Sequence, residues 1–564
     1  MIASTSLCPP LLSMTVAISF NLGKDPMALR EIFGLQVAIF NWFQAFFRYS
    51  SQEEVFVLVD DKASLDSIKE CADAAGFDQK RLVALDRRFV QENFTRFDTI
   101  FRPDPYAQHL FWQRQLSNAH YTFCGLAHAI SGLETGELLE RYCLHPTEST
   151  DAIVSPSHAV ASAIRSFWDL YGDFLEQRFG SKFRCPVQLP IIPLGVDIGR
   201  FEKLAAADKR ADQRQKLGLT DDDTAVLWVG RLSHAIKAHP LSMFQAVERA
   251  AEITGKPVHL IVFGYFIELK DEPHFKELAA DFCKKAKVTF VSNKDPRFPD
   301  GAWAAGDIFI SLIDNMQESF GLTPIEAMAA GLPRVISDWD GYRDSVTDGE
   351  DGFAIPTLQP PPGSGDALSA LLLTGREMYG GFLAKTAMSV AVDQRRAGEA
   401  IAKLVMDKNL RRTMVEKAKV RAKATYDWKH VIPAYEALWR EMAAKRKIEA
   451  ATMKKPKWPS VIPECPDPFS MYAAYPTAAL KETDKLTIMA SAGEIKKLWK
   501  HGLNLFALDM MISPEETTKL IAYVSAQSNV SIGDVFRQFA SCDRAALWRT
   551  IGWLIKLGVL ASRP

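Results

Sequence analysis

The stretch QESFGLTPIEAMAAGLP, from Gln317 to Pro333, carries two glutamates, Glu318 and Glu326, eight residues apart. The apolar run before it, DIFISLI, predicts a strand that ends near Ile313, and PIEAMAA predicts a helix that stops at a glycine. The stretch therefore predicts a strand, a loop and a helix, which is the repeating unit of an α/β sheet.

Glu326 has a purely structural interpretation. Thr323 suits a helix N-cap, Pro324 suits the first helical position, and Glu326 follows Thr323 by three residues, which makes a capping box. The local pattern alone favours this role. Glu318 has no comparable explanation, because it lies in the loop before the helix.

The position of Glu318 indicates a ligand. Ligands of open α/β sheets bind beyond the carboxyl ends of the strands, where this loop is expected. The helix N-terminus that follows offers free N–H groups suited to phosphate. A carboxylate beside it can accept hydrogen bonds from sugar hydroxyls. Together these features suggest a sugar nucleotide.

Similar units extend in both directions along the chain. Continuous apolar runs, typical of strands buried on both faces, alternate with helical patterns such as 159–174. The chain is therefore predicted to hold two doubly wound α/β halves, one before about residue 205 and one after. The expected strands are MTVAISF, EVFVLVDD, RLVALD, YTFCGL, DAIVSPS and LPIIPLG in the first half and AVLWVG, VHLIVFG, VTFVS, DIFISLI and PRVIS in the second.

Composition narrows the class of protein. The chain has 564 residues, 48% of them hydrophobic, and a formal net charge of −1. Chains of this length hold about three or four domains, and the balanced charge argues against a chain-wide nucleic-acid binder. The eight cysteines are scattered without a C-x-x-C pair, so we expect reduced thiols and no zinc ribbon.

The amino-terminal region shows no charged segment before its apolar stretch, so no signal peptide is expected. The longest apolar region, 32–47, is interrupted by polar residues and is too short to span a membrane. We expect it to be a buried helix, and a membrane-surface helix is the alternative.

The sequence predicts five segments. These are a first lobe (14–205), a second lobe (206–425), a crossing helix (426–445), a basic and proline-rich linker (446–469) and a mainly helical C-terminal domain (470–564). DRAALWRTIGWLIKLGVLA resembles the last helix and strand of a winged-helix unit, with Ile551, Leu554 and Ile555 at core spacing. Arg544, Arg549 and Lys556 are too few for a convincing DNA helix.

The ordered motifs resemble retaining glycosyltransferases of family 4, which have the GT-B fold. ESFGLTPIE matches the E-x7-E motif of that family. VSPS, PLGVD, VGRLSHAIK, AAGDIFISL, EAMAAGLP and DGEDGFAI match further family motifs in the same order. The resemblance covers about residues 14–445. Each motif is weak alone, but the ordered set is specific.

The resemblance implies roles for individual residues. Glu318 falls beside the donor sugar, and Glu326 holds the ribose hydroxyls. Arg231 and Lys237 neutralise the departing diphosphate, an effect that can contribute several kcal/mol. The alternative is that the two cations only contribute charge to the protein surface. The backbone of four residues meets the diphosphate: Phe320, Gly321, Leu322 and Thr323.

On the first lobe, His128 fits the family's histidine near the donor sugar, with His109 and His120 as competitors. Asp197 is expected to order the loop between the halves. Two features depart from the family. A single Gly23, followed by Lys24, stands where members often have a glycine pair, although Gly23 can still approach phosphate.

In the second lobe, Arg334 stands where an apolar residue is usual, and an insertion spans roughly 360–390. No essential metal or cofactor is expected. Asp221–Asp223 resembles a metal-binding D-x-D motif, but it precedes a strand, at the wrong edge for a ligand. Asp60 and Asp61 do follow a strand but lack the context of the other glycosyltransferase fold.

The sequence thus predicts a metal-independent retaining glycosyltransferase that moves a sugar from a nucleotide-sugar to a glycan or lipid-linked acceptor, by family analogy in cell-envelope polysaccharide synthesis. We expect a cytoplasmic location, with peripheral contact at the inner face of the membrane left open. A weakly active sugar-nucleotide-binding scaffold, acting through residues 470–564, is the alternative. That domain is expected to bind a protein or self-associate rather than bind nucleic acid.

Overall fold

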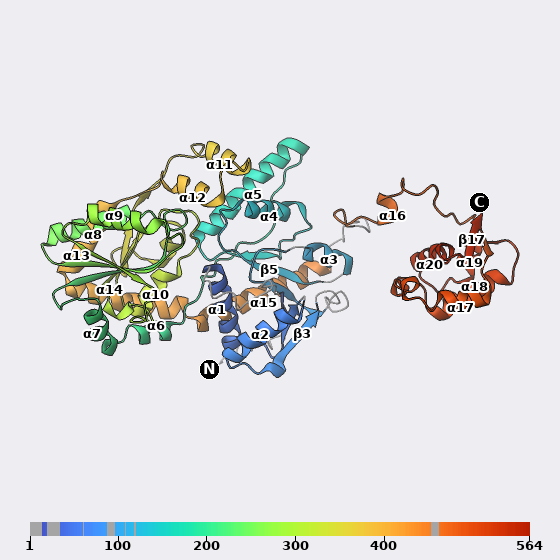
Figure 1. Cartoon of the computed structure of the whole chain (residues 1–564), viewed down its shortest axis with the longest axis horizontal. Coiled ribbons are helices and arrows are strands. Elements are labelled where there is room, and N and C mark those ends of the chain that lie inside the picture. The colour runs from blue at the N-terminus through green and yellow to red at the C-terminus, as the bar shows by residue number, and fades with distance from the viewer. Residues whose placement is uncertain are drawn as a thin grey trace, which may run out of the picture. The chain divides into compact units, whose positions relative to one another are not determined.

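The structure is a computed structural model that describes residues 14–19, 34–59, 61–86, 96–107, 109–117, 120–452 and 462–563. The chain divides into two compact units, Met1–Lys455 and Pro456–Pro564, coloured from blue to orange and in red in Figure 1. The first unit holds two lobes, each built around one parallel sheet.

The first lobe contains a six-stranded parallel sheet in the order β3-β2-β1-β4-β5-β6. Every residue of β1, β2, β4, β5 and β6 is buried, as continuous apolar runs predict. The strands are β1 (Val16–Ser19), β2 (Val55–Val59), β3 (Leu82–Asp86), β4 (Thr99–Arg102), β5 (Thr122–Leu126) and β6 (Ala152–Val154).

Two sequence-based strand assignments in this lobe needed correction. The run LPIIPLG, 189–195, is no strand, because Ile191 in it and Gln188 just before it make only isolated bridges, to Ser155 and to Ala152 of β6. The central strand β4 was not predicted, since TIFR is only four residues long and follows polar sequence.

Among the residues that the structure describes in this lobe, the helices are α1 (Gly34–Tyr49), α2 (Lys62–Ala74), α3 (Leu110–Ser117), α4 (Leu133–Leu144) and α5 (His158–Phe179). The apolar region 32–47 forms most of α1 and buries Trp42, Phe43 and Phe46 almost completely, which confirms a buried helix. Among the described residues, no helix has both the length and the apolar character needed to cross a membrane.

The second lobe repeats the first. Its parallel sheet has the order β12-β11-β10-β7-β8-β9, so both sheets have the 3-2-1-4-5-6 order of the Rossmann fold. The strands are β7 (Thr224–Leu232), β8 (Val258–Phe266), β9 (Lys287–Ser292), β10 (Ile308–Ser311), β11 (Arg334–Ser337) and β12 (Gly352–Ile355).

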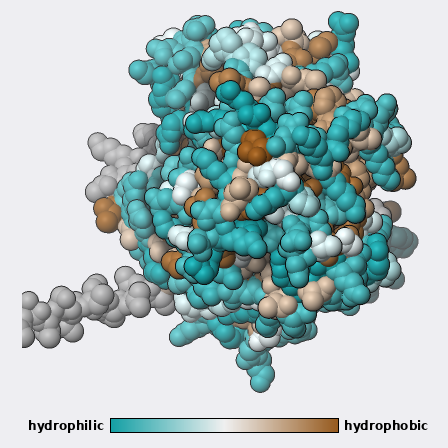
Figure 2. All heavy atoms as spheres, turned by 90° about the vertical axis from the view of Figure 1, so that its left-hand side faces the viewer, coloured by the Kyte–Doolittle hydropathy of each residue, from teal (hydrophilic) through white to brown (hydrophobic). Residues whose placement is uncertain are grey.

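The helices of this lobe are α6 (Ile198–Leu204), α7 (Ala207–Lys216), α8 (Leu241–Thr254), α9 (Asp271–Phe282), α10 (Leu322–Ala330), α13 (Gln394–Met406) and α14 (Lys408–Arg421). Their outer face is largely hydrophilic, with single hydrophobic residues scattered over it (Figure 2). Amphipathic helices that cover a buried sheet produce such a surface.

Arg334, which departs from the family pattern, is fully buried in β11. Its guanidinium donates to the carbonyl of Ser345 at 2.6 Å and to the carboxylate of Asp351 at 2.9 Å. Burial lowers the pKa of Arg334 to about 10 even though Asp351 opposes the shift. The departure is therefore a structural ion pair that joins β11 to the segment before β12.

The insertion forms an arm on the second lobe. Its neck is an antiparallel pair, β13 (Thr357–Leu358) and β14 (Ala391–Val392), and two helices complete it, α11 (Asp366–Leu373) and α12 (Tyr379–Ala387). In Figure 1 the arm is drawn in yellow and orange beside α4 and α5 of the first lobe.

The helix α15 (Trp428–Thr452) leaves the second lobe and crosses back to the first, as the sequence predicts. Tyr435 and Trp439 are fully buried on it. The Trp439 ring lies 5.2 Å from that of Phe101 on β4, between centroids, and Tyr435 lies 5.7 Å from Trp42 on α1. This helix thereby completes the core of the first lobe.

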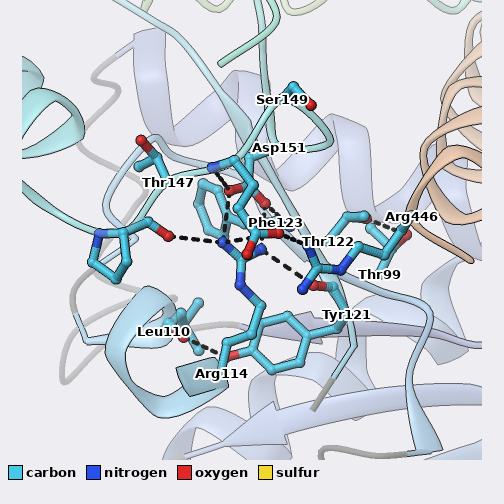
Figure 3. A network of polar contacts seen from close by, with 12 residues as sticks. Thr99, Leu110, Arg114, Tyr121, Thr122, Phe123, Thr147, Ser149, Asp151 and Arg446 are labelled. Carbon is cyan, nitrogen blue, oxygen red and sulfur yellow. Dashed lines mark hydrogen bonds and ion pairs between the residues drawn. The ribbon is translucent and has the colours of Figure 1, made fainter. Parts of the chain in front are cut away.

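A polar network secures the end of α15 (Figure 3). Arg114 donates to both carboxylate oxygens of Asp151, at 2.7 and 2.9 Å, and both side chains are almost fully buried. Arg446 on α15 pairs with Glu148, and Lys445 donates to the carbonyl of Ser149 at 3.1 Å. The network joins α15 to the segment before β6.

The second unit has a three-stranded antiparallel sheet, in the order β16-β15-β17, packed against helices. The predicted final helix and strand are confirmed as α20 and β17, and Ile551 and Leu554 are buried core residues. The elements are α16 (Pro468–Met471), β15 (Lys485–Ile488), α17 (Ala492–Leu498), α18 (Pro514–Ser525), β16 (Val530–Ser531), α19 (Ile532–Gln538), α20 (Arg544–Lys556) and β17 (Leu560–Arg563).

Candidate functional site

The candidate site lies where the strand order of the second sheet reverses. β7 and β10 are neighbours there, and their connections leave in opposite directions along the sheet. Arg231 lies near the end of β7, Lys237 lies in the turn after it, and Glu318 lies in the loop after β10. Ligands of doubly wound sheets bind at this reversal. Three residues predicted from two separate motifs thus lie at one edge of the sheet.

Lys237 and Glu318 form a direct ion pair. The Lys237 Nζ donates to Glu318 Oε2 at 2.9 Å, and the two side chains are 22% and 17% exposed. Burial alone would raise the pKa of the Glu318 carboxyl, but the charges of Lys237 and Arg231 outweigh it and hold the pKa below its usual value. Glu318 is therefore ionised at neutral pH, beside two cations and partly open to solvent.

The N-terminus of α10 lies directly after this loop. The helix begins at Leu322, and its N-cap is Gly321, with φ 83° and no side-chain cap. A Cβ at Gly321 would lie 2.0 Å from the ring of Tyr342, so glycine is required there for both space and conformation. In the part of the chain that the structure describes, the N–H groups of 320–323 donate no backbone hydrogen bond.

The capping box expected at Thr323 and Glu326 is wrong. Thr323 lies inside the first turn, because the close packing of Gly321 on Tyr342 starts the helix earlier than the local pattern suggests. The end of the helix is confirmed at Gly331, which is left-handed. Glu326 is therefore not needed to cap the helix, and its structural interpretation fails.

Glu326 instead lines a cleft of about 530 Å³. Burial raises the pKa of its carboxyl to about 7, and Arg200, which also lines the cleft, opposes the shift. Among the described residues, none donates a hydrogen bond to this carboxylate. The cleft lies between α1 of the first lobe and the second lobe, where Trp428 and Asn293 also line it.

His128 lies on the first lobe, in the loop after β5. Its Nε2 lies 2.7 Å from the carbonyl oxygen of Pro103, which follows β4. Since a carbonyl can only accept, Nε2 carries the proton and Nδ1 is left as an acceptor. Burial lowers the pKa of the imidazole, which keeps it neutral.

The other predicted residues are placed as follows. Asp197 caps α6, accepting from the N–H of Arg200 at 3.0 Å, which confirms its structural role. Asp221–Asp223 form the turn before β7, at the edge away from the site. Gly23, Lys24 and Asp60 lie outside the described residues.

The sequence reasoning missed two acids near the ion pair. Asp314 is buried three residues after β10 and accepts from the N–H of His239, two residues beyond Lys237, and burial raises the pKa of its carboxyl to about 7. Asp340 has φ 38°, and the turn that carries it packs against the backbone of Ser319 and Phe320. Burial and the charge of Glu318 raise the pKa of its carboxyl, and Lys237 opposes the shift. The polar end of the run LIDN could have revealed Asp314.

The lobes touch beside the site. The hydroxyl of Ser157, which also caps α5, donates to the carbonyl of Ser319 at 2.8 Å. The N–H of His158 donates to Asp344 of the second lobe at 2.7 Å. The first-lobe motif VSPS thereby contacts the residue next to Glu318.

Residues 209–369 match the family model described as "Glycosyl transferases group 1". D-inositol 3-phosphate glycosyltransferases are similar to part of the chain. The protein from Nocardia farcinica is 29% identical over 187 residues, which cover 33% of this chain and 40% of that protein. The one from Mycobacteroides abscessus is 32% identical over 189 residues, with the same coverage. The chain thus spans about 40% of the length of these relatives.

Solved structures match over both lobes. Anabaena Alr3699/HepE in complex with UDP and glucose has a TM-score of 0.44 at 15% identity, covering 78% of this chain and 100% of that one. A sucrose-phosphate synthase from Thermosynechococcus elongatus has a TM-score of 0.44 at 16% identity, covering 77% and 100%. The two parallel six-stranded sheets with their flanking helices fit the two Rossmann-like lobes of the GT-B fold. The family match lies within its second lobe.

Proposed function

We propose that the protein is a retaining glycosyltransferase that moves a sugar from a nucleotide-sugar donor to a glycan or lipid-linked acceptor without an essential metal or cofactor. The observation that carries the proposal is the pairing of Lys237 with Glu318 at 2.9 Å, at the strand-order reversal and directly before the N-terminus of α10. Cations, a hydroxyl acceptor and free N–H groups meet there, and a sugar diphosphate needs all three.

The donor has one orientation that uses these groups. Its diphosphate accepts from the N–H groups at the start of α10 and faces Lys237 and Arg231. Its sugar hydroxyls donate to Glu318, and its ribose hydroxyls donate to Glu326 in the cleft. Ionised Glu318 suits an acceptor of hydrogen bonds, and the match to a glycosyltransferase family in this lobe supports the assignment.

In the transfer step one bond is broken and one is formed at the anomeric carbon of the sugar. The bond from this carbon to the diphosphate oxygen breaks, and a bond to the acceptor oxygen forms on the same face. The acceptor's proton passes to the departing phosphate. Lys237 and Arg231 stabilise the charge that develops on the diphosphate, an effect worth about 3–4 kcal/mol for a well-placed donor. Neutral His128 offers Nδ1 to a hydroxyl of the sugar.

Acceptor and cellular role follow from family analogy alone. We propose an acceptor bound on the first lobe, a role in cell-envelope polysaccharide synthesis in the cytoplasm, and peripheral membrane contact. For the second unit we propose a winged-helix-like module for protein contacts. Two of its basic residues are already engaged, since Arg544 pairs with Glu482 and Arg549 donates to the carbonyl of Met510.

The test is donor binding and hydrolysis with UDP-, GDP- and ADP-sugars, for wild type, Glu318→Ala and Lys237→Ala. We expect one donor class to bind and turn over, and both variants to lose turnover. The matched control is Lys276→Ala, which removes an exposed i,i+4 pair with Glu272 on α9. If no donor binds to the wild type, or if the variants behave like the control, the proposal is wrong.

A further inference from the structure

The arm of the second lobe reaches the first lobe near His128. The phenol oxygen of Tyr379, at the start of α12, lies 2.8 Å from the hydroxyl of Ser131, three residues beyond His128. The ring also faces Gly132, where a Cβ would lie 3.8 Å from Tyr379 Cε2. The contact is therefore both a hydrogen bond and a packing contact between the lobes.

The arm is built to hold this phenol in place. The neck is anchored by Val392, which is buried in the core of the second lobe, and by the hydroxyl of Thr357, which donates to the carbonyl of Asp338 at 2.9 Å. From that neck α12 spans nine residues, or about 14 Å at 1.5 Å per residue, and Tyr379 is at its far end.

The turn before α12 is also held by contacts to α11 and to α12 itself. Glu377 pairs with Lys385 on the helix, and its N–H donates to the carbonyl of Leu371 on α11 at 3.1 Å. A Cβ at Gly381 would lie 2.1 Å from the Glu377 carboxylate, so a glycine is needed for this carboxylate to lie across the helix. Leu383 is fully buried on the same helix. Tyr379 is therefore presented by a rigid element.

The loop that receives Tyr379 is held at both ends. At the start, Ala127 donates to the carbonyl of Val154 at 2.8 Å, and His128 bonds the carbonyl of Pro103. At the other end, Gly132 is the N-cap of α4, and the hydroxyl of Ser131 just before it contacts the phenol of Tyr379 on the arm. The second lobe therefore sets one end of the loop whose other end carries the imidazole.

We propose that Tyr379 is a positioning residue for the transfer reaction. Through Ser131 it sets the loop of His128 and holds the first lobe over the donor sugar, which keeps water from the anomeric carbon. This inference rests on the proposed function. The family match ends at residue 369, within α11, so the match does not include Tyr379.

The Tyr379→Phe variant tests the hydrogen bond, because the ring on Gly132 remains. We expect transfer to fall about fivefold, the rate equivalent of one net hydrogen bond, while donor KM stays within about twofold, since Glu326 and α10 are untouched. Donor hydrolysis should rise relative to transfer. Tyr475→Phe, which alters an 82% exposed tyrosine in the second unit, is the matched control.

A thermodynamic cycle and a structural readout separate positioning from general damage. Ser131→Ala should reproduce the effect, and the double variant should lose no more than either single variant, as expected for partners in one contact. Amide exchange at Thr135 and Gly136, which bond to the carbonyl of Gly132, should become faster in all three variants. Replacing 359–390 by Asn-Gly, which closes β13 and β14 as a two-residue hairpin, should cause at least the same loss.

The outcomes are distinct. A wild type that turns over no donor contradicts the proposed function, and the positioning role fails with it. If the wild type transfers sugar, and Tyr379→Phe and Ser131→Ala have the same transfer-to-hydrolysis ratio and the same amide exchange as the wild type, only this inference is overturned. Losses that add in the double variant overturn it as well, because they show that the two side chains act separately.

Discussion

One ion-pair cluster of the first lobe and one of the second differ in their access to solvent. Arg114 and Asp151 in the first lobe are about 1% and 0% exposed, and Asp151 also accepts from the N–H groups of Phe123 and Glu148. Lys237 and Glu318 in the second lobe remain partly exposed, beside helix N–H groups that lack partners among the described residues. The charges of the first cluster pair with one another away from solvent, although Arg114 Nε has no hydrogen-bond partner among the described residues. The second cluster is partly open to solvent and lies beside those N–H groups. Access to a ligand, rather than the presence of an ion pair, therefore distinguishes the candidate site.

The largest effect should come from breaking the closed cluster. Arg114→Met leaves Asp151 buried without its cation, and we expect the free energy of unfolding of the first unit to fall by about 3–5 kcal/mol. Chemical denaturation measures it. Arg184→Met, which removes an exposed pair with Asp173, is the control and should cost less than about 1 kcal/mol. Equal effects of the two variants would contradict the distinction.

Substitution in the partly exposed cluster, Lys237 with Glu318, should reduce the rate of transfer and leave stability nearly unchanged. If Lys237 stabilises the departing diphosphate as proposed, Lys237→Met should lower kcat by about 10²–10³, because that charge is lost. Stability should change by less than about 1 kcal/mol, because the pair is partly exposed and Arg231 still faces Glu318. Single-turnover kinetics measure the loss of rate, and chemical denaturation of the same sample measures the change in stability. A large loss of stability with modest loss of rate would make this pair structural too.

Glu326 allows a test of the cleft through pH. Its pKa is raised to about 7 by burial, and ribose hydroxyls that donate to it favour the ionised form. Donor binding should therefore release a proton near pH 7, and affinity should increase from pH 6 to pH 8. Calorimetry in buffers of different ionisation enthalpy measures the release, with a nucleotide-sugar whose diphosphate does not titrate there. Glu326→Gln should abolish it, and a release that persists would assign the proton elsewhere.

The smallest expected effect concerns Asp340. Its left-handed φ of 38° is strained for a non-glycine residue, and burial raises the pKa of its carboxyl well above the usual value. Asp340→Gly should therefore raise stability by about 1 kcal/mol at pH 8.

The pH dependence gives the control for this variant. The folded state holds the Asp340 proton more tightly than the unfolded state, so this group destabilises the fold increasingly as pH rises above its ordinary pKa, near 4. The gain in Asp340→Gly should be smaller at pH 4. Asn529→Gly, which relieves a φ of 83° in the second unit without removing a carboxyl, should show a pH-independent effect. If the gain in stability of Asp340→Gly does not depend on pH, burial of the Asp340 carboxyl does not contribute to it.

Long apolar runs made the sheets predictable from sequence, and the E-x7-E spacing predicted a candidate site in the loop after β10, where the strand order reverses. The errors arose where tertiary contacts outweighed local pattern. Thr323 suits an N-cap, but the ring of Tyr342 fixes Gly321 as the cap instead. Arg334 was predicted within a strand, but the reason for a charged residue there could not be predicted, because its partner Asp351 lies 17 residues away. The contact of Tyr379 with Ser131 spans 248 residues and leaves no local signal.

The helix α15 also has a consequence for synthesis on the ribosome. Trp42 and Phe101 are made early, but the rings of Tyr435 and Trp439 that pack on them emerge only after the entire second lobe. The N-terminal sheet must wait for these side chains, so its aromatic surface is exposed while the second lobe is already able to fold. A nascent chain stopped near residue 426 would present that surface to chaperones, and release of the next 25 residues would cover it.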